Sequence, residues 1–120
     1  MTNFDQNDVE KYLIMNEDEL YALLVPDHLR RSEHLYSRSG LIARGKEIFN
    51  YKLKYIQETI CKNYNSYKDM KNDIVALVTL LANAFSNEPQ FAGIPVIPIA
   101  VLITKIGLDK ICKEGIKRAI

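Results

Sequence analysis

Apolar residues recur at the spacing of an α-helix over the middle of the chain. Side chains three, four or seven residues apart lie on the same face of a helix. Lysine and glutamate occupy many of the other positions, so we predict an amphipathic helix over residues 40–63, capped by Ser39. The residues of its apolar stripe are Ile42, Phe49, Leu53, Ile56, Ile60 and Tyr64.

Residues 70–86 form a second helical segment, which is apolar on nearly all sides. Ser66 and Asp69, just before it, have the spacing of a capping box. A helix that is apolar all round has to be covered all round, so we predict that this helix is the central element of the core. A loop over residues 87–93 is expected to follow it.

A last helix is expected to begin near Pro95 or Pro98, because proline is tolerated in the first turn, and to end before Gly115. Together with residues 70–86 it would make a C-terminal αα-hairpin packed on the long amphipathic helix. The core residues predicted for this last helix are Ile99, Leu102, Ile103, Ile106 and Ile111.

Two short helices are predicted before Pro26, which ends the second of them. Residues 27–39 contain few apolar side chains and allow one more short helix. The two pairs with capping-box spacing are Asn7 with Glu10, and Asn16 with Glu19.

The fold class that follows is all-α, a small bundle of four to five helices. A chain of 120 residues has the length of one domain, so residues 1–120 are expected to form a single helical domain. Within it, we expect residues 1–25 to form an acidic helical arm and residues 40–114 to form the core bundle. The uncharged run 89–104 has sixteen residues and three prolines, fewer than the ~20 apolar residues that span a membrane.

The cysteine content bears on the compartment. Two cysteines are too few for the disulfide framework of a small secreted protein, and no signal peptide opens the chain. We predict a cytoplasmic protein in which Cys61 and Cys112 are small reduced core residues. A single disulfide between the two cysteines is the alternative. Frequent Lys, Ile, Asn and Tyr indicate an AT-rich, bacterial or phage genome.

The sequence contains no catalytic or cofactor-binding pattern. His28 and His34 are six residues apart and do not share a helix face, as an i, i+4 pair of metal ligands would. The acids Glu17, Asp18 and Glu19 fit the first turn of a helix, where the helix dipole favours them. No glycine-rich phosphate loop is present. We therefore expect no metal, no cofactor and no enzymatic activity.

Charge is segregated along the chain, although the net charge is only +1. Residues 1–29 carry a net charge of −6, and residues 30–120 carry +7. A nearly neutral chain is not built to coat nucleic acid or an anionic membrane. Either the acidic segment lies on the chain's own basic body, or one of the two segments receives a partner.

Arginines concentrate between residues 28 and 46, whereas lysine is the usual base elsewhere. Arginine contacts carboxylates and phosphates through two N–H groups at once. The local concentration of arginine therefore indicates a binding surface rather than a surface that only keeps the protein soluble. A helix-turn-helix over residues 29–50 would place its turn at Ser39 and Gly40, but its second helix would begin with apolar residues that cannot read bases. The predicted partner-binding residues are Arg30, Arg31, Tyr36, Arg38, Arg44 and Lys46, with Glu17, Asp18 and Glu19 on the acidic side.

These observations favour a non-catalytic protein–protein interaction module. We expect a small bacterial accessory, adaptor or immunity-type subunit that binds a larger protein partner through charged helix surfaces. One alternative is a nucleic-acid-binding regulator that uses the basic cluster from Arg30 to Lys46, and another is a membrane-associated helical hairpin. The sequence leaves homo-oligomerisation open.

Overall fold

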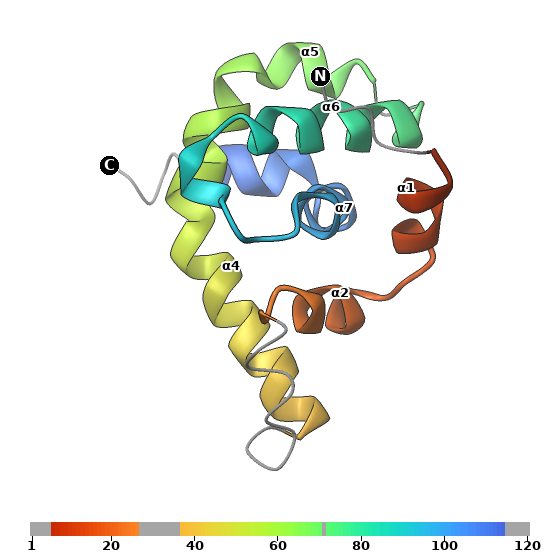
Figure 1. Cartoon of the computed structure of the whole chain (residues 1–120). Coiled ribbons are helices and arrows are strands. Elements are labelled where there is room, and N and C mark those ends of the chain that lie inside the picture. Colours follow the sequence, from red (N-terminus) through yellow and green to blue (C-terminus); the bar gives the residue numbers. More distant parts are fainter. Residues whose placement is uncertain (1–5, 27–36, 71, 115–120) are drawn as a thin grey trace.

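The computed structural model describes residues 6–26, 37–70 and 72–114, and the regular elements in these ranges are helices (Figure 1). The predicted all-α fold class is therefore confirmed. The short helix considered for residues 27–39 lies largely outside the described residues. The α-helices are α1 (Gln6–Leu13), α2 (Glu17–Leu23), α4 (Arg38–Ile60), α5 (Tyr64–Lys68), α6 (Ile74–Ser86) and α7 (Val96–Ile106). Two 3₁₀ turns, η1 (Cys61–Asn63) and η2 (Pro89–Phe91), and a π-helical turn, η3 (Lys110–Glu114), complete the described elements.

Helix α7 is the centre of the bundle. Its six consecutive residues from Pro98 to Ile103 are all buried, so neighbours cover it on every side. Helices α1, α2 and α6 contact it, and Figure 1 shows it seen almost end-on among them. We predicted α6 for this position, and that prediction is wrong. Ile74 and Leu80 on α6 are 40% and 44% exposed, because α6 has neighbours on one side and solvent on the other.

Helices α6 and α7 pack against each other, as predicted for the C-terminal pair. In Figure 1 α6 lies across the page while α7 points along the line of sight, so the two helices cross at a steep angle. The turn between them also contributes to the core. Phe91 in η2 is buried, and its ring centre lies 4.7 Å from that of Phe85 at the end of α6.

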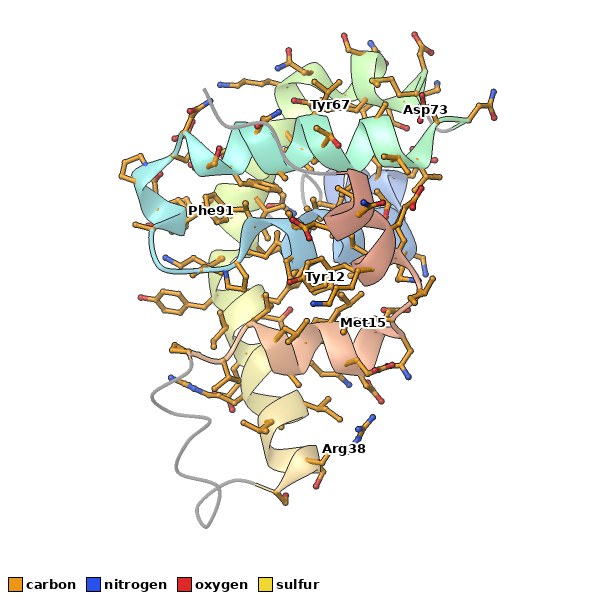
Figure 2. All side chains as sticks on the ribbon, turned by 45° about the vertical axis from the view of Figure 1, so that its right-hand side comes forward. Tyr12, Met15, Arg38, Tyr67, Asp73 and Phe91 are labelled. Atoms are coloured by element: carbon orange, nitrogen blue, oxygen red, sulfur yellow. A yellow bond between two sulfur atoms is a disulfide. The ribbon has the colours of Figure 1, made fainter. Side chains whose placement is uncertain are left out.

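The apolar stripe of the long helix is confirmed over most of its length. Phe49, Ile56 and Ile60 are buried, and Leu53 packs against the same core. Ile42 lies outside this core, because the first turns of α4 extend beyond the other helices (Figures 1 and 2).

The acidic N-terminal residues are part of the same core. Val9 in α1 and Leu20 in α2 are fully buried, and Leu24 is 1% exposed. All three belong to one cluster with the buried residues of α4, α6 and α7. The described part of this segment, residues 6–26, therefore packs as part of the bundle.

One predicted cap, at Asn16, is confirmed, and two, at Ser39 and at Ser66 with Asp69, are wrong. The Asn16 side chain accepts from the Glu19 amide (2.8 Å), and the Glu19 carboxylate accepts from the Asn16 amide (3.2 Å). Helix α4 begins two residues earlier than Ser39 would set it, because the Ser37 hydroxyl accepts from the Gly40 amide (3.1 Å).

Helix α6 also starts elsewhere than predicted, because Asp73, not Ser66 with Asp69, caps it through the Ala76 amide (3.1 Å). The first buried residue of α6, Leu77, follows one turn later. The described part of helix α1 begins at Gln6 and includes Asn7, and the residues before Gln6 lie outside the described ranges.

Two helices end earlier than predicted. Helix α4 ends at Ile60, and the chain continues through η1 into α5, which turns back over the bundle. Helix α7 ends at Ile106, with Gly107 as its C-cap, so that Ile111, predicted for this helix, lies beyond it in η3. The φ of Gly107 is +113°, a conformation that side chains other than glycine rarely adopt. In the described residues, no helix is both long enough and apolar enough to cross a membrane.

Helix α2 can approach α4 closely because residue 45 is a glycine. A Cβ atom placed on Gly45 would lie 1.8 Å from the carbonyl oxygen of Tyr21 and 2.4 Å from its carbonyl carbon. These are backbone atoms, which cannot rotate away as the end of a side chain can. The absence of a side chain at residue 45 therefore sets the distance between the two helices.

Gly45→Ala should destabilise the fold, although glycine-to-alanine changes inside helices usually stabilise by about 0.5–1 kcal/mol. The added methyl group would displace α2 and uncover Leu20, so we expect a loss of about 3 kcal/mol in the free energy of unfolding, as for severe overpacking. Urea unfolding monitored by circular dichroism measures it. Asn50→Ala, an exposed change on the same helix, is the control and should leave stability within about 0.5 kcal/mol of wild type. Equal stability of Gly45→Ala and wild type would contradict the close contact.

Candidate functional site

The structure places six of the nine predicted partner-binding residues. Arg30, Arg31 and Tyr36 lie outside the described residues. The acids Glu17, Asp18 and Glu19 form the first turn of α2. Arg38, Arg44 and Lys46 lie on the first part of α4.

The acidic turn of α2 and the basic part of α4 meet at Tyr21. The Tyr21 ring packs edge-on against Phe49, with ring centres 5.7 Å apart. The ammonium nitrogen of Lys46 lies 5.7 Å from the centre of the Tyr21 ring, a cation–π contact. Glu17 and Asp18 lie one turn before Tyr21 and act on it electrostatically. Lys46 and the acidic turn therefore contribute to the packing of α2 on α4.

The three basic residues on α4 do not form one patch. Arg44 forms an ion pair with Glu47 at 2.9 Å on the same helix, and the two side chains are 45% and 66% exposed. Arg38 is exposed at the outer end of α4 (Figure 2). Arg38 and Arg44 are six positions apart, so their side chains point to different sides of the helix.

A continuous exposed surface runs along α4 opposite its core stripe. Its residues recur at spacings of three, four and seven, and they cover about a third of the helix circumference. Tyr51 lies near its middle and is 79% exposed. We call this surface the outer face of α4, and it consists of Arg44, Glu47, Asn50, Tyr51, Lys54 and Glu58.

Sequence reasoning missed Tyr51, although a signal was present. Phe49 and Leu53 belong to the apolar stripe, and a residue midway between them points to the opposite side of the helix. An aromatic residue among charged neighbours on that side is exposed, and this pattern could have identified Tyr51 before the structure.

Cys61 and Cys112 form a disulfide, with Cα atoms 5.4 Å apart. The predicted reduced state is therefore wrong and the alternative of a single disulfide holds, while the predicted core position is confirmed for Cys112, which is 2% exposed. The stripe of α4 continues to Cys61 at the helix end, and η3 brings Cys112 back against that end. The sequence could not show this pairing, because it depends on how far α7 runs before Gly107 turns the chain.

Two hydrogen bonds lie close to the disulfide. The Gln57 side chain donates to the Ile111 carbonyl at 3.0 Å, and the Tyr64 hydroxyl bonds to the Asp109 carboxylate. Ile111 and Cys112 are buried, with 6% and 2% exposure. A groove of about 320 Å³ opens beside the disulfide, lined by Cys61, Lys62, Asn63, Tyr64, Asn65, Ser66 and Cys112.

Among the described residues, no three His, Cys, Asp or Glu side chains gather where they could hold a metal ion. His28 and His34 lie outside those residues. Comparisons of the chain with known protein families, with curated proteins and with solved structures find no match.

Removing the disulfide should lower the free energy of unfolding by about 4 kcal/mol, because the bond closes a loop between residues 51 positions apart. A chain of 120 residues has a stability of roughly 6–18 kcal/mol, so the helical core should remain folded. The double variant Cys61→Ala/Cys112→Ala, compared with the oxidised wild type by urea unfolding, measures the change. Identical midpoints would show that the bond adds no stability.

Because of Tyr21, the free energy of unfolding should depend on pH in the alkaline range. Burial raises the pKa of its phenol above 10.0, and the negative charges of Glu17 and Asp18 raise it further. The folded chain therefore holds this proton more tightly than the unfolded chain does. The resulting contribution is fully present below pH 10 and is lost as the pH rises through the raised pKa.

Tyr21→Phe removes this group, so its free energy of unfolding should fall less steeply than that of wild type above pH 10. Urea unfolding at several pH values gives both slopes. Asn50→Ala, an exposed change that removes no titratable group, is the control and should keep the wild-type slope. If Tyr21→Phe and wild type have the same slope, Tyr21 is not held in its neutral form by the fold.

Proposed function

We propose that the chain is a non-catalytic protein–protein interaction module that binds a larger protein partner through the outer face of α4. The observation that carries this proposal is the exposure of Tyr51, 79%, in the middle of a 23-residue helix. The core holds the opposite side of α4 rigidly through Phe49, Ile56 and Ile60. An aromatic side chain on a rigid helix can bind a partner at little cost in conformational entropy.

The composition of the outer face favours a protein over a nucleic acid. Tyrosine and arginine are the residues most enriched among interface hot spots. The face carries the carboxylates of Glu47 and Glu58 beside Arg44 and Lys54, and Glu47 holds the Arg44 guanidinium. Carboxylates repel phosphates, whereas a surface with both signs of charge can pair with a complementary protein surface.

The two alternatives have less support. A helix-turn-helix with its turn at Ser39 and Gly40 does not fit, because both residues lie in the first turn of α4. A regulator that contacts phosphates through Arg38 and Lys46 remains the second proposal. In a membrane-associated hairpin the apolar positions of α7 would face lipid, yet α1, α2 and α6 cover them.

Within this proposal the protein is a small bacterial accessory, adaptor or immunity-type subunit located in the cytoplasm. The disulfide provides a test of location. Disulfides persist in oxidising compartments, whereas cytosolic thiols keep cysteine pairs reduced. Alkylation of thiols in intact cells, before lysis, would find Cys61 and Cys112 modified if the protein is cytoplasmic.

A photo-crosslinking phenylalanine derivative in place of Tyr51, introduced in the native host, should form a covalent adduct with one protein. Isothermal titration of that purified protein should then give a Kd for Tyr51→Ala that is about 30-fold weaker than wild type, as for an interface hot spot. Leu80→Ala and Lys105→Glu, exposed changes on α6 and α7, are the controls and should bind within about twofold of wild type.

Wild-type affinity in the double variant Tyr51→Ala/Arg44→Glu would rule out the outer face as the binding site. The nucleic-acid alternative makes a different prediction, because binding to phosphates weakens steeply with salt. If the wild-type chain binds a DNA duplex in that salt-dependent manner and Arg38→Glu abolishes binding, the chain is a nucleic-acid-binding regulator and not a protein–protein interaction module.

A further inference from the structure

We infer that the Cys61–Cys112 disulfide is a reducible clamp, which a thiol attacks at Cys61 and whose opening releases residues 108–114 from the folded core. The reactant is a low-molecular-weight thiol or dithiol. This inference stands on the contacts around the disulfide and does not depend on the proposed function.

The groove beside the disulfide gives a thiolate access to one of the two sulfur atoms. Cys61 is partly exposed, whereas Cys112 is 2% exposed. Lys62, adjacent to Cys61, lines the same groove, and its positive charge favours the approach of a thiolate. The described lining residues include no carboxylate that would oppose this approach. Attack is therefore favoured at the Cys61 sulfur, with Cys112 as the leaving group.

The exchange needs two thiols, which a dithiol supplies. The first thiolate forms a bond with the Cys61 sulfur, and the bond to Cys112 breaks with its electron pair on the Cys112 sulfur, which takes up a proton. The second thiolate of the reagent attacks the reagent sulfur in this mixed disulfide and displaces the Cys61 thiolate, which is also protonated. The protein disulfide is reduced by two electrons, and the dithiol leaves as its cyclic disulfide.

Besides the disulfide, the burial of Ile111 and Cys112 in the core cluster and local hydrogen bonds hold the segment. The hydrogen bonds include the one from Gln57 to the Ile111 carbonyl and the one between Tyr64 and Asp109. Gly107 ends α7 at φ +113° and separates the segment from that helix. Helices α1, α2 and α6 cover α7 independently of η3. The segment can therefore detach while residues 99–103 stay buried.

Opening the clamp changes the surface of the molecule at one place. Ile111 and Cys112 belong to the apolar core cluster and are almost fully buried in the closed form. When the segment detaches, both side chains meet solvent at the end of α4. The reduced form therefore presents an apolar surface that the oxidised form conceals.

Hydrogen–deuterium exchange of the full oxidised chain, with and without dithiothreitol and without denaturant, tests the release. We expect exchange at the amides of residues 108–114 to rise at least about tenfold on reduction, while residues 99–103 change by less than about twofold. The double variant Cys61→Ala/Cys112→Ala should show the reduced pattern without any reagent, and dithiothreitol should not alter it.

A brief exposure to glutathione, stopped with acid and analysed by peptide mapping, tests the site of attack. The mixed disulfide should lie on Cys61 at least about fivefold more often than on Cys112, as its greater exposure requires. Lys62→Gln should slow the reaction at least about twofold, and Lys105→Gln, on α7, should not slow it.

Three results would overturn the inference. The disulfide would be a structural bond alone if dithiothreitol reduced it only in denaturant. The clamp would not be local if residues 99–103 exchanged together with residues 108–114 on reduction. Adducts mainly on Cys112 would show that the thiol attacks the Cys112 sulfur and not the Cys61 sulfur.

Discussion

The need to cover α7 on all sides governs this fold. Six consecutive buried residues, from Pro98 to Ile103, leave no face of the helix for solvent. Burying one isoleucine, leucine or valine side chain stabilises a fold by about 1.5–3 kcal/mol. A single neighbouring helix can cover only one face. Helices α1, α2 and α6 are therefore all required to cover α7. The acidic N-terminal segment thus has a structural role, because it contains α1 and α2.

The cover over α7 in turn determines which surface of α4 is free. Helix α2 contacts both α7 and α4, and the glycine at residue 45 allows its backbone to lie directly on α4. Tyr21 completes this contact through Phe49 and Lys46. The inner side of α4 is thus occupied along much of its length, and the outer face with Tyr51 is left exposed.

Local periodicity predicted much of the fold. The stripe of Phe49, Ile56 and Ile60, the capping box at Asn16 and the core residues Ile99, Leu102 and Ile103 of α7 follow from spacing along one helix. Periodicity cannot say how many neighbours a helix has, and α6 and α7 look equally apolar in sequence. The choice between them depends on α1 and α2, which are distant in the chain.

Features that join distant segments could not be predicted. The requirement for glycine at residue 45 becomes visible only when Tyr21 is placed against it. The pairing of Cys61 with Cys112 likewise becomes visible only when the fold brings the two residues together. The candidate site was predictable in part. Arginine enrichment pointed to α4, but the pairing of Arg44 with Glu47 and the exposure of Tyr51 depend on which side of the helix the core occupies.

Deleting residues 1–26 tests most directly whether α1 and α2 are needed to cover α7. The oxidised fragment 27–120 should lose the cooperative thermal transition of the full chain in circular dichroism, because the apolar residues of α7 would be exposed to water. A cooperative transition at the same midpoint as the full chain would contradict this account and would show that the remaining helices form a self-sufficient core.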